Sequence, residues 1–133
     1  MVDLTRLTLD QVLFVMIGMH VFADFICQGW FLNGKQKTWW QKMCRQDLGQ
    51  ELEQTKYRYD YLVGIVLHSL FWSMLVCMPF FCWTSLWKAV LLNTAFHAVV
   101  DDLKANRGVL NLIQDQALHL LQIFVTIVCM FSF

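Results

Sequence analysis

The chain has 133 residues, of which 58% are hydrophobic and only 15% are charged, and its 10 basic and 10 acidic side chains give zero net charge. Soluble domains have about 25% charged residues, so this composition indicates an integral membrane protein and excludes an ordinary soluble domain. Because the sequence contains no basic stripe, we expect no nucleic acid among its partners.

The first part of the chain contains one apolar segment and one charged segment. Residues 9–32 are apolar over a length that exceeds a cleaved signal peptide, and Asn33-Gly34 is typical of a helix end. Residues 33–60 are rich in both basic and acidic side chains, and their composition favours a short surface helix. Trp39 and Trp40 suit a membrane interface. We therefore predict a first membrane span followed by a polar loop.

The second part contains three further apolar segments, at residues 61–83, 86–103 and 109–131, separated by short polar turns. About 20 residues are needed to cross the bilayer core as a helix, so we expect four spans in all. Short connections make consecutive helices antiparallel neighbours. The predicted fold is all-α: one polytopic membrane domain, with about four transmembrane helices in an up-down bundle and one amphipathic, charged cytoplasmic loop.

The distribution of lysine and arginine predicts the orientation. Most of the basic residues lie in the 33–60 loop and in the turn that contains Lys104 and Arg107, whereas the opposite side has only Arg6 and Lys88. The positive-inside rule then places both loops in the cytoplasm and both termini outside it. The five cysteines include no Cys-x-x-Cys motif, so we interpret them as small apolar side chains, with Cys44 a free thiol in the loop.

All four histidines lie inside apolar segments, and three of them have an aspartate four residues away. The candidate residues are His20, Asp24, His68, His97, Asp101, Asp115 and His119. Residues four apart share one face of a helix, so each pair presents an imidazole and a carboxylate side by side. Charged groups in an apolar span are costly unless they face a partner, a metal or a wet cavity. We therefore interpret these pairs as the functional residues.

The candidate residues share one depth in the predicted bundle. Measured from the span ends at 1.5 Å per residue, they lie roughly 8–18 Å from the cytoplasmic face, and reversing the orientation keeps this layer. Further polar residues extend the same helix faces, namely Gln28, Asn93, Asn111 and Gln122. Polar side chains in lipid turn toward the bundle interior, so we expect these stripes to converge.

Imidazole nitrogens and carboxylate oxygens suit a divalent transition metal, with zinc preferred and manganese or iron as alternatives. Seven donors exceed the needs of one tetrahedral ion, so either two metals bind or some aspartates orient ligating histidines. Such a site could lower the pKa of water to about 7. Three other interpretations stay open: hydrogen bonds that join helices, bis-histidine haem ligation, and a conduction path for protons or metal ions.

Five ordered motifs cover nearly the whole chain. They are His20-x-x-x-Asp24-Phe25-x-x-Gln28, Asn33-Gly34-Lys35-Gln36-Lys37, Leu67-His68-Ser69-Leu70, His97-x-x-x-Asp101-x-x-Lys104 and Asp115-Gln116-x-x-His119. In these motifs the chain resembles a family of small bacterial and phage integral membrane proteins, that of domain of unknown function 3307. The resemblance implies about four spans and no established activity, and it adds Gln28, Lys104 and Gln116 to the candidate site. The charged segment at about 38–58 departs from the usually more compact members.

The most specific hypothesis is a metal-dependent hydrolase of the bacterial inner membrane, acting on a lipid-borne or otherwise membrane-accessible substrate. In it the four histidines are metal ligands, Asp24, Asp101 and Asp115 are ligands or catalytic bases, and Lys104 contacts an anionic group. For Lys104, a helix-end cation that reaches the interface is the other interpretation. The alternative function is a non-enzymatic homo-oligomer, either a channel or a membrane-perturbing effector, whose His/Asp pairs line a pore or join protomers. The lipid bilayer is a partner in both cases.

Overall fold

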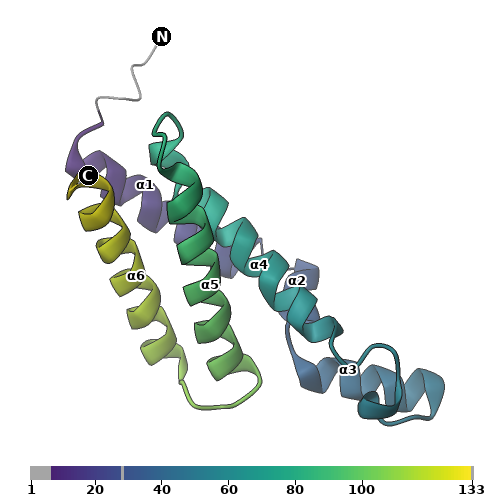
Figure 1. Ribbon diagram of the computed structural model, residues 1–133. Helices are drawn as coiled ribbons and strands as arrows, with labels where there is room; N and C mark the ends of the chain where they lie inside the picture. Colours follow the sequence, from purple (N-terminus) through teal and green to yellow (C-terminus); the bar gives the residue numbers. More distant parts are fainter. Residues whose placement is uncertain (1–6, 28, 133) are drawn as a thin grey trace.

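The computed structural model describes residues 7–27 and 29–132, and within these residues it contains helices and turns but no strand. The α-helices are α1 (Leu9–Val21), α2 (Gly29–Gly34), α3 (Lys37–Met43), α4 (Asp60–Val76), α5 (Leu86–Ala105) and α6 (Leu112–Ser132) (Figure 1). Two π-helical turns, η2 (Phe22–Ile26) and η3 (Cys44–Leu48), follow α1 and α3. Two short 3₁₀ turns are η4 (Leu52–Gln54) and η5 (Met78–Phe80). The all-α prediction is confirmed.

The four long helices form a ring in which α1 contacts α4, α4 contacts α5, α5 contacts α6, and α6 contacts α1. The turn between α5 and α6 lies at the same end of the ring as α3 (Figure 1). The end of α6 and the turn between α4 and α5 lie at the other end, where an apolar core fills the ring. That core includes Met16, Trp72, Val76, Phe80 and Ile127, all buried.

Among the residues that the structure describes, two helical segments are long and apolar enough to cross a membrane, Leu9–Ile26 and Leu112–Ser132, and the apolar α4 is shorter. Two boundaries differ from the prediction. The first apolar segment is not one helix to residue 32, because the chain leaves helical geometry at Cys27 before α2 begins. The segment predicted at 61–83 ends as a helix at Val76, since Pro79 has no N–H for the helical hydrogen-bond ladder and sits in η5 instead.

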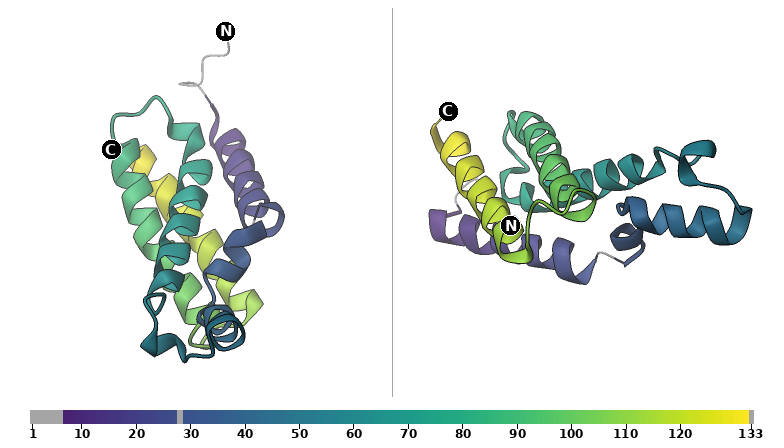
Figure 2. Two further views of the ribbon diagram at one scale, coloured as in Figure 1. Left: turned by 90° about the vertical axis from the view of Figure 1, so that its right-hand side faces the viewer. Right: turned by 90° about the horizontal axis from the view of Figure 1, so that it is seen from below.

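The break after η2 lets α2 turn back against α4. Gly64 of α4 lies so close to α2 that a Cβ at this position would overlap the carbonyl oxygen of Gly34. Only glycine permits this approach, which brings Lys35 onto the side of the bundle. The predicted surface helix is present as α3, which extends away from the ring (Figure 2). Cys44, at the end of α3, is buried rather than exposed.

Candidate metal centre

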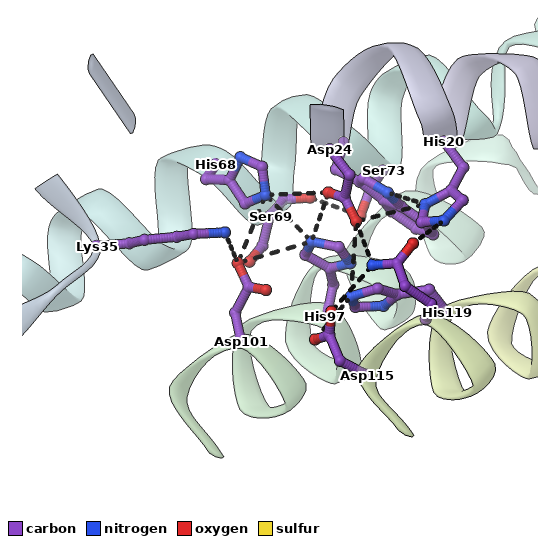
Figure 3. Close-up of polar contacts among 12 residues, drawn as sticks. His20, Asp24, Lys35, His68, Ser69, Ser73, His97, Asp101, Asp115 and His119 are labelled. Atoms are coloured by element: carbon purple, nitrogen blue, oxygen red, sulfur yellow. Dashed lines mark hydrogen bonds and ion pairs between the residues drawn. The ribbon is translucent and has the colours of Figure 1, made fainter. Parts of the chain in front are cut away.

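The ring brings together all seven histidines and aspartates that the sequence singles out. His20 comes from α1, Asp24 from η2, His68 from α4, His97 and Asp101 from α5, and Asp115 and His119 from α6. Each of the seven is at most 6% exposed. Figure 3 shows their side chains pointing toward one another in the centre of the ring. We call these seven residues the His/Asp cluster.

Helical geometry places each pair side by side, as the spacing predicts. Nε2 of His97 lies 3.8 Å from Oδ2 of Asp101, and Nε2 of His119 lies 3.4 Å from Oδ1 of Asp115. Asp24 sits in the π-helical turn η2, where the Cys27 N–H donates to the carbonyl oxygen of Phe22. A π-turn inserts an extra residue into the helix and is frequent at functional sites, because it redirects a side chain.

Four donor atoms meet between α4, α5 and η2, and we call them the α4–α5 donor set: Nε2 of His68, Nε2 of His97, Oδ2 of Asp101 and Oδ1 of Asp24. The two nitrogens are 3.3 Å apart. Nε2 of His68 lies 3.4 Å from Asp24 and 3.5 Å from Asp101, and Nε2 of His97 lies 3.9 Å and 3.8 Å from the same oxygens. Ligand atoms of a tetrahedral zinc ion at about 2.0–2.1 Å would be about 3.3–3.4 Å apart. Within this set, His68, His97 and Asp101 form a group whose donor atoms lie close enough together to hold one ion.

Several buried polar atoms of the cluster make no hydrogen bond within residues 7–27 and 29–132. They include Oδ1 of Asp24, Oδ1 of Asp115 and Nε2 of His119, and also Nδ1 of His97 and of His119. A buried polar atom without a partner costs about 1–3 kcal/mol, and most such atoms in proteins are satisfied by a partner, a water or an ion. Three groups of this cluster could hold a metal ion: Asp24, His97 and His119; His68, His97 and Asp101; and Asp101, Asp115 and His119.

Hydrogen bonds engage both ring nitrogens of His20. The indole N–H of Trp72 donates to Nδ1 at 3.0 Å, so Nε2 carries the proton and donates to Oε1 of Gln116, also at 3.0 Å. In the part of the chain that the structure describes, His20 belongs to none of the three candidate metal groups. Nδ1 also lies 3.5 Å from Oδ2 of Asp24. Both ring nitrogens of His20 therefore have protein partners in this structure, and its role as a metal ligand stays a prediction.

Two lysines are paired with carboxylates of the cluster. The charged composition of its segment suggested that Lys35 is solvated. Lys35 is instead only 6% exposed, and its Nζ donates to Asp101 at 2.8 Å. Lys104 donates to Oδ2 of Asp115 at 2.5 Å, and its side chain is 33% exposed. Lys104 therefore pairs with a carboxylate of the protein, and its predicted contact with an anionic group in the function of the site stays a prediction. Lys35 lay within the family-like motif, which was the one signal that could have found it.

One aromatic and one amide side chain, which the sequence patterns alone did not identify as site residues, also contact the cluster. Trp72 stacks on the ring of His97 at 4.3 Å between centroids, and His97 stacks on His119 at 4.2 Å. Gln116, which the resemblance had added to the candidates, donates to Oδ2 of Asp115 at 2.9 Å. These contacts fix the orientation of the imidazoles before any ion binds, which is the usual role of residues around metal ligands.

Three polar residues of the predicted stripes lie outside the cluster. Asn93 and Gln122 are buried but bond to each other, with Nε2 of Gln122 donating to Oδ1 of Asn93 at 2.7 Å. Asn111 is exposed and accepts a hydrogen bond from the N–H of Gln114 at the start of α6, so its prediction as an interior residue was wrong. Gln28 lies outside the described residues.

Comparison with family models, with curated proteins and with solved structures finds no match for this chain. The kind of metal that the site would bind therefore follows from its own donor atoms. These are imidazole nitrogens and carboxylate oxygens, a combination that suits divalent transition metals. The five cysteines are free, and none belongs to the candidate metal groups found among the described residues.

Proposed function

We propose that this chain is a four-span membrane protein that binds a divalent transition metal, with zinc preferred, and hydrolyses a membrane-accessible substrate. The observation that carries the proposal is the α4–α5 donor set, in which Nε2 of His68 and Nε2 of His97 are 3.3 Å apart and each lies 3.4–3.9 Å from one oxygen of Asp24 and one oxygen of Asp101. A divalent ion there would supply Lewis acidity and would lower the pKa of water to about 7. The resemblance to the family of domain of unknown function 3307 stays a prediction, and it adds no activity.

The surface of the bundle supports four spans. Large apolar side chains face outward on every long helix, including Phe14 of α1 (80% exposed), Val63 of α4, Leu92 of α5 (73%) and Ile113 of α6 (80%). The buried interior holds the histidines, aspartates and amides instead. Monomeric soluble proteins rarely expose apolar patches of this extent, whereas lipid solvates them. With the basic segments at one end of the ring, the positive-inside rule places that end in the cytoplasm and both termini outside.

A groove between α5 and α6 supports a lipid-borne substrate. It has a volume of about 710 Å³ and is lined largely by apolar side chains, including Leu92, Phe96, Leu121 and Val125. Its lining reaches Asn93 and Gln122, each about one helical turn from a histidine of the cluster. An acyl chain could lie in this groove with its polar end toward the cluster.

The stacking of two imidazoles argues against haem ligation by that pair. The rings of His97 and His119 are stacked at 4.2 Å between centroids, which leaves no space for a porphyrin between them. The buried interior beyond the His/Asp cluster includes apolar side chains, such as Met16, Val76 and Phe80, and also the amides of Asn93 and Gln122. A conduction path, which would use polar groups of this kind, therefore stays the alternative function.

The test is metal analysis of protein purified in detergent without chelators, comparing the wild type with His97→Ala and with Asn93→Ala. Asn93 is the matched control because it is buried on α5, one turn from His97, and lies outside the candidate metal groups. We expect the wild type and Asn93→Ala to retain metal and His97→Ala to lose it while remaining in the membrane. A metal-free wild type would contradict the proposal.

A second test separates a charge role from simple hydrogen bonding. Asp24→Asn and Asp101→Asn keep the shape and much of the hydrogen-bonding capacity of the side chains but remove their charge. We expect both variants to accumulate in the membrane and to lose hydrolysis of ester probes presented in lipid vesicles. If the cluster only joined helices, the asparagines would be tolerated and any activity would persist.

A further inference from the structure

The α6 side of the His/Asp cluster carries donor atoms that the α4–α5 donor set does not use. Nε2 of His119 lies 3.4 Å from Oδ1 of Asp115 and 3.8 Å from Oδ2 of Asp24. We call these three atoms the α6 donor set. All three residues are more than nine-tenths buried, and neither Nε2 of His119 nor Oδ1 of Asp115 has a hydrogen-bond partner among the described residues.

Asp24 contributes one carboxylate oxygen to each set. Its Oδ1 lies 3.4 Å from Nε2 of His68, and its Oδ2 lies 3.8 Å from Nε2 of His119. A carboxylate that faces two donor sets in this way is suited to bridge two cations, and two-metal sites hold their ions about 3.5–4 Å apart. The π-turn that contains Asp24 is what directs this side chain between α4 and α6.

We propose that the α6 donor set binds a second divalent cation, that Asp24 bridges the two ions, and that the substrate is a phosphoester. This inference rests on the proposed function, since it requires the first ion in the α4–α5 donor set. Two ions that share a bridging carboxylate clamp both the attacking and the leaving oxygen of a phosphoryl group, which one ion does not do.

The charges around the cluster favour an anionic substrate. Asp24, Asp101 and Asp115 face Lys35 and Lys104, so with neutral histidines the site has one net negative charge. Two divalent ions would change this to three net positive charges in a buried site. Uncompensated buried charge is costly, so the loaded centre would bind a phosphate group more strongly than a neutral ester.

The more exposed of the two lysines lies beside the α6 donor set. Lys104 is bonded to Asp115 and has a side chain that is 33% exposed, whereas the side chain of Lys35 is 8% exposed. Lys104 is therefore the lysine that is accessible to a phosphate group from solvent. Hydrolysis would form a bond between the oxygen of water and phosphorus, break the bond between phosphorus and the alcohol oxygen, and transfer one proton from water to that alcohol.

The experiment loads the detergent-purified full chain with Mn²⁺ and measures both the bound metal and the electron paramagnetic resonance spectrum. We expect about two ions per chain and the signal of a spin-coupled pair, and we expect inorganic phosphate to perturb that signal. His119→Ala should bind about one ion and lose the coupling. Gln122→Ala is the matched control, because Gln122 is buried on the same helix outside both donor sets, and it should keep both ions.

The outcomes separate this inference from the proposed function. One ion per wild-type chain, lost in His97→Ala but kept in His119→Ala, would overturn the second site and leave the metal hydrolase intact. No bound ion would overturn both. If His119→Ala fails to accumulate, the number of ions per wild-type chain and the spin coupling between them still test whether a second ion binds. With two ions bound, cleavage of bis(para-nitrophenyl) phosphate supports the substrate class, and cleavage of para-nitrophenyl butyrate alone would overturn it.

Discussion

Replacing Lys35 with methionine would leave the buried carboxylate of Asp101 without its lysine. The side chains of this pair are 8% and 3% exposed, and their charged atoms are 2.8 Å apart. Removing one partner of a buried ion pair costs about 3–5 kcal/mol. At roughly 4 °C per kcal/mol for a chain of this size, Lys35→Met should lower the midpoint of thermal unfolding by about 12–20 °C.

The matched control lies two residues away. Lys37 pairs with Glu53 at 3.1 Å, but these side chains are 38% and 58% exposed, so the pair contributes only about 0–1 kcal/mol. The assay is the loss of helical circular dichroism on heating in detergent. The double variant Lys35→Met with Asp101→Asn removes both charges and should recover much of the loss. The reasoning is refuted if Lys35→Met unfolds within about 2 °C of Lys37→Met.

Three further predictions follow from single contacts. Gly64→Ala should destabilise the bundle by about 1–3 kcal/mol in thermal unfolding, because its Cβ would displace α2, whereas Gly18→Ala, with nothing within 4 Å, should be neutral or stabilising; equal effects would contradict this. Trp72→Phe removes an indole N–H that positions the cluster and should weaken Zn²⁺ binding about 10-fold in a competition titration, and unchanged affinity would count against it. Impermeant maleimide applied from outside should label the exposed Cys82 and spare an exposed cysteine introduced by Gln50→Cys, and the reverse pattern would invert the topology.

The cluster itself was predictable because its spacing is a property of single helices. The two members of each His/Asp pair are four positions apart in the sequence, and an α-helix places such residues on one face. Their common depth followed from counting along the chain. The one local surprise is Asp24, since the sequence does not show that the first helix passes into a π-turn at Phe22.

The residues that sequence patterns missed depend on contacts between distant segments. Lys35 is buried because α2 turns back on α4 through Gly34 and Gly64, and its charged neighbours in the sequence suggest the opposite. Trp72 is one of many aromatic side chains in apolar helices, and only the packed ring shows that its N–H reaches His20. That same bond engages Nδ1 of His20, which no spacing rule could show.

The central claim is that two histidines and two aspartates of the ring bind a divalent metal, and X-ray absorption at the zinc edge tests it most directly. For zinc-loaded wild-type protein we predict nitrogen and oxygen neighbours at about 2.0–2.1 Å, with the outer-shell scattering of imidazole rings. The His68→Ala variant should show weaker imidazole scattering. Sulfur neighbours at about 2.3 Å, or a zinc shell unchanged in His68→Ala, would contradict the account.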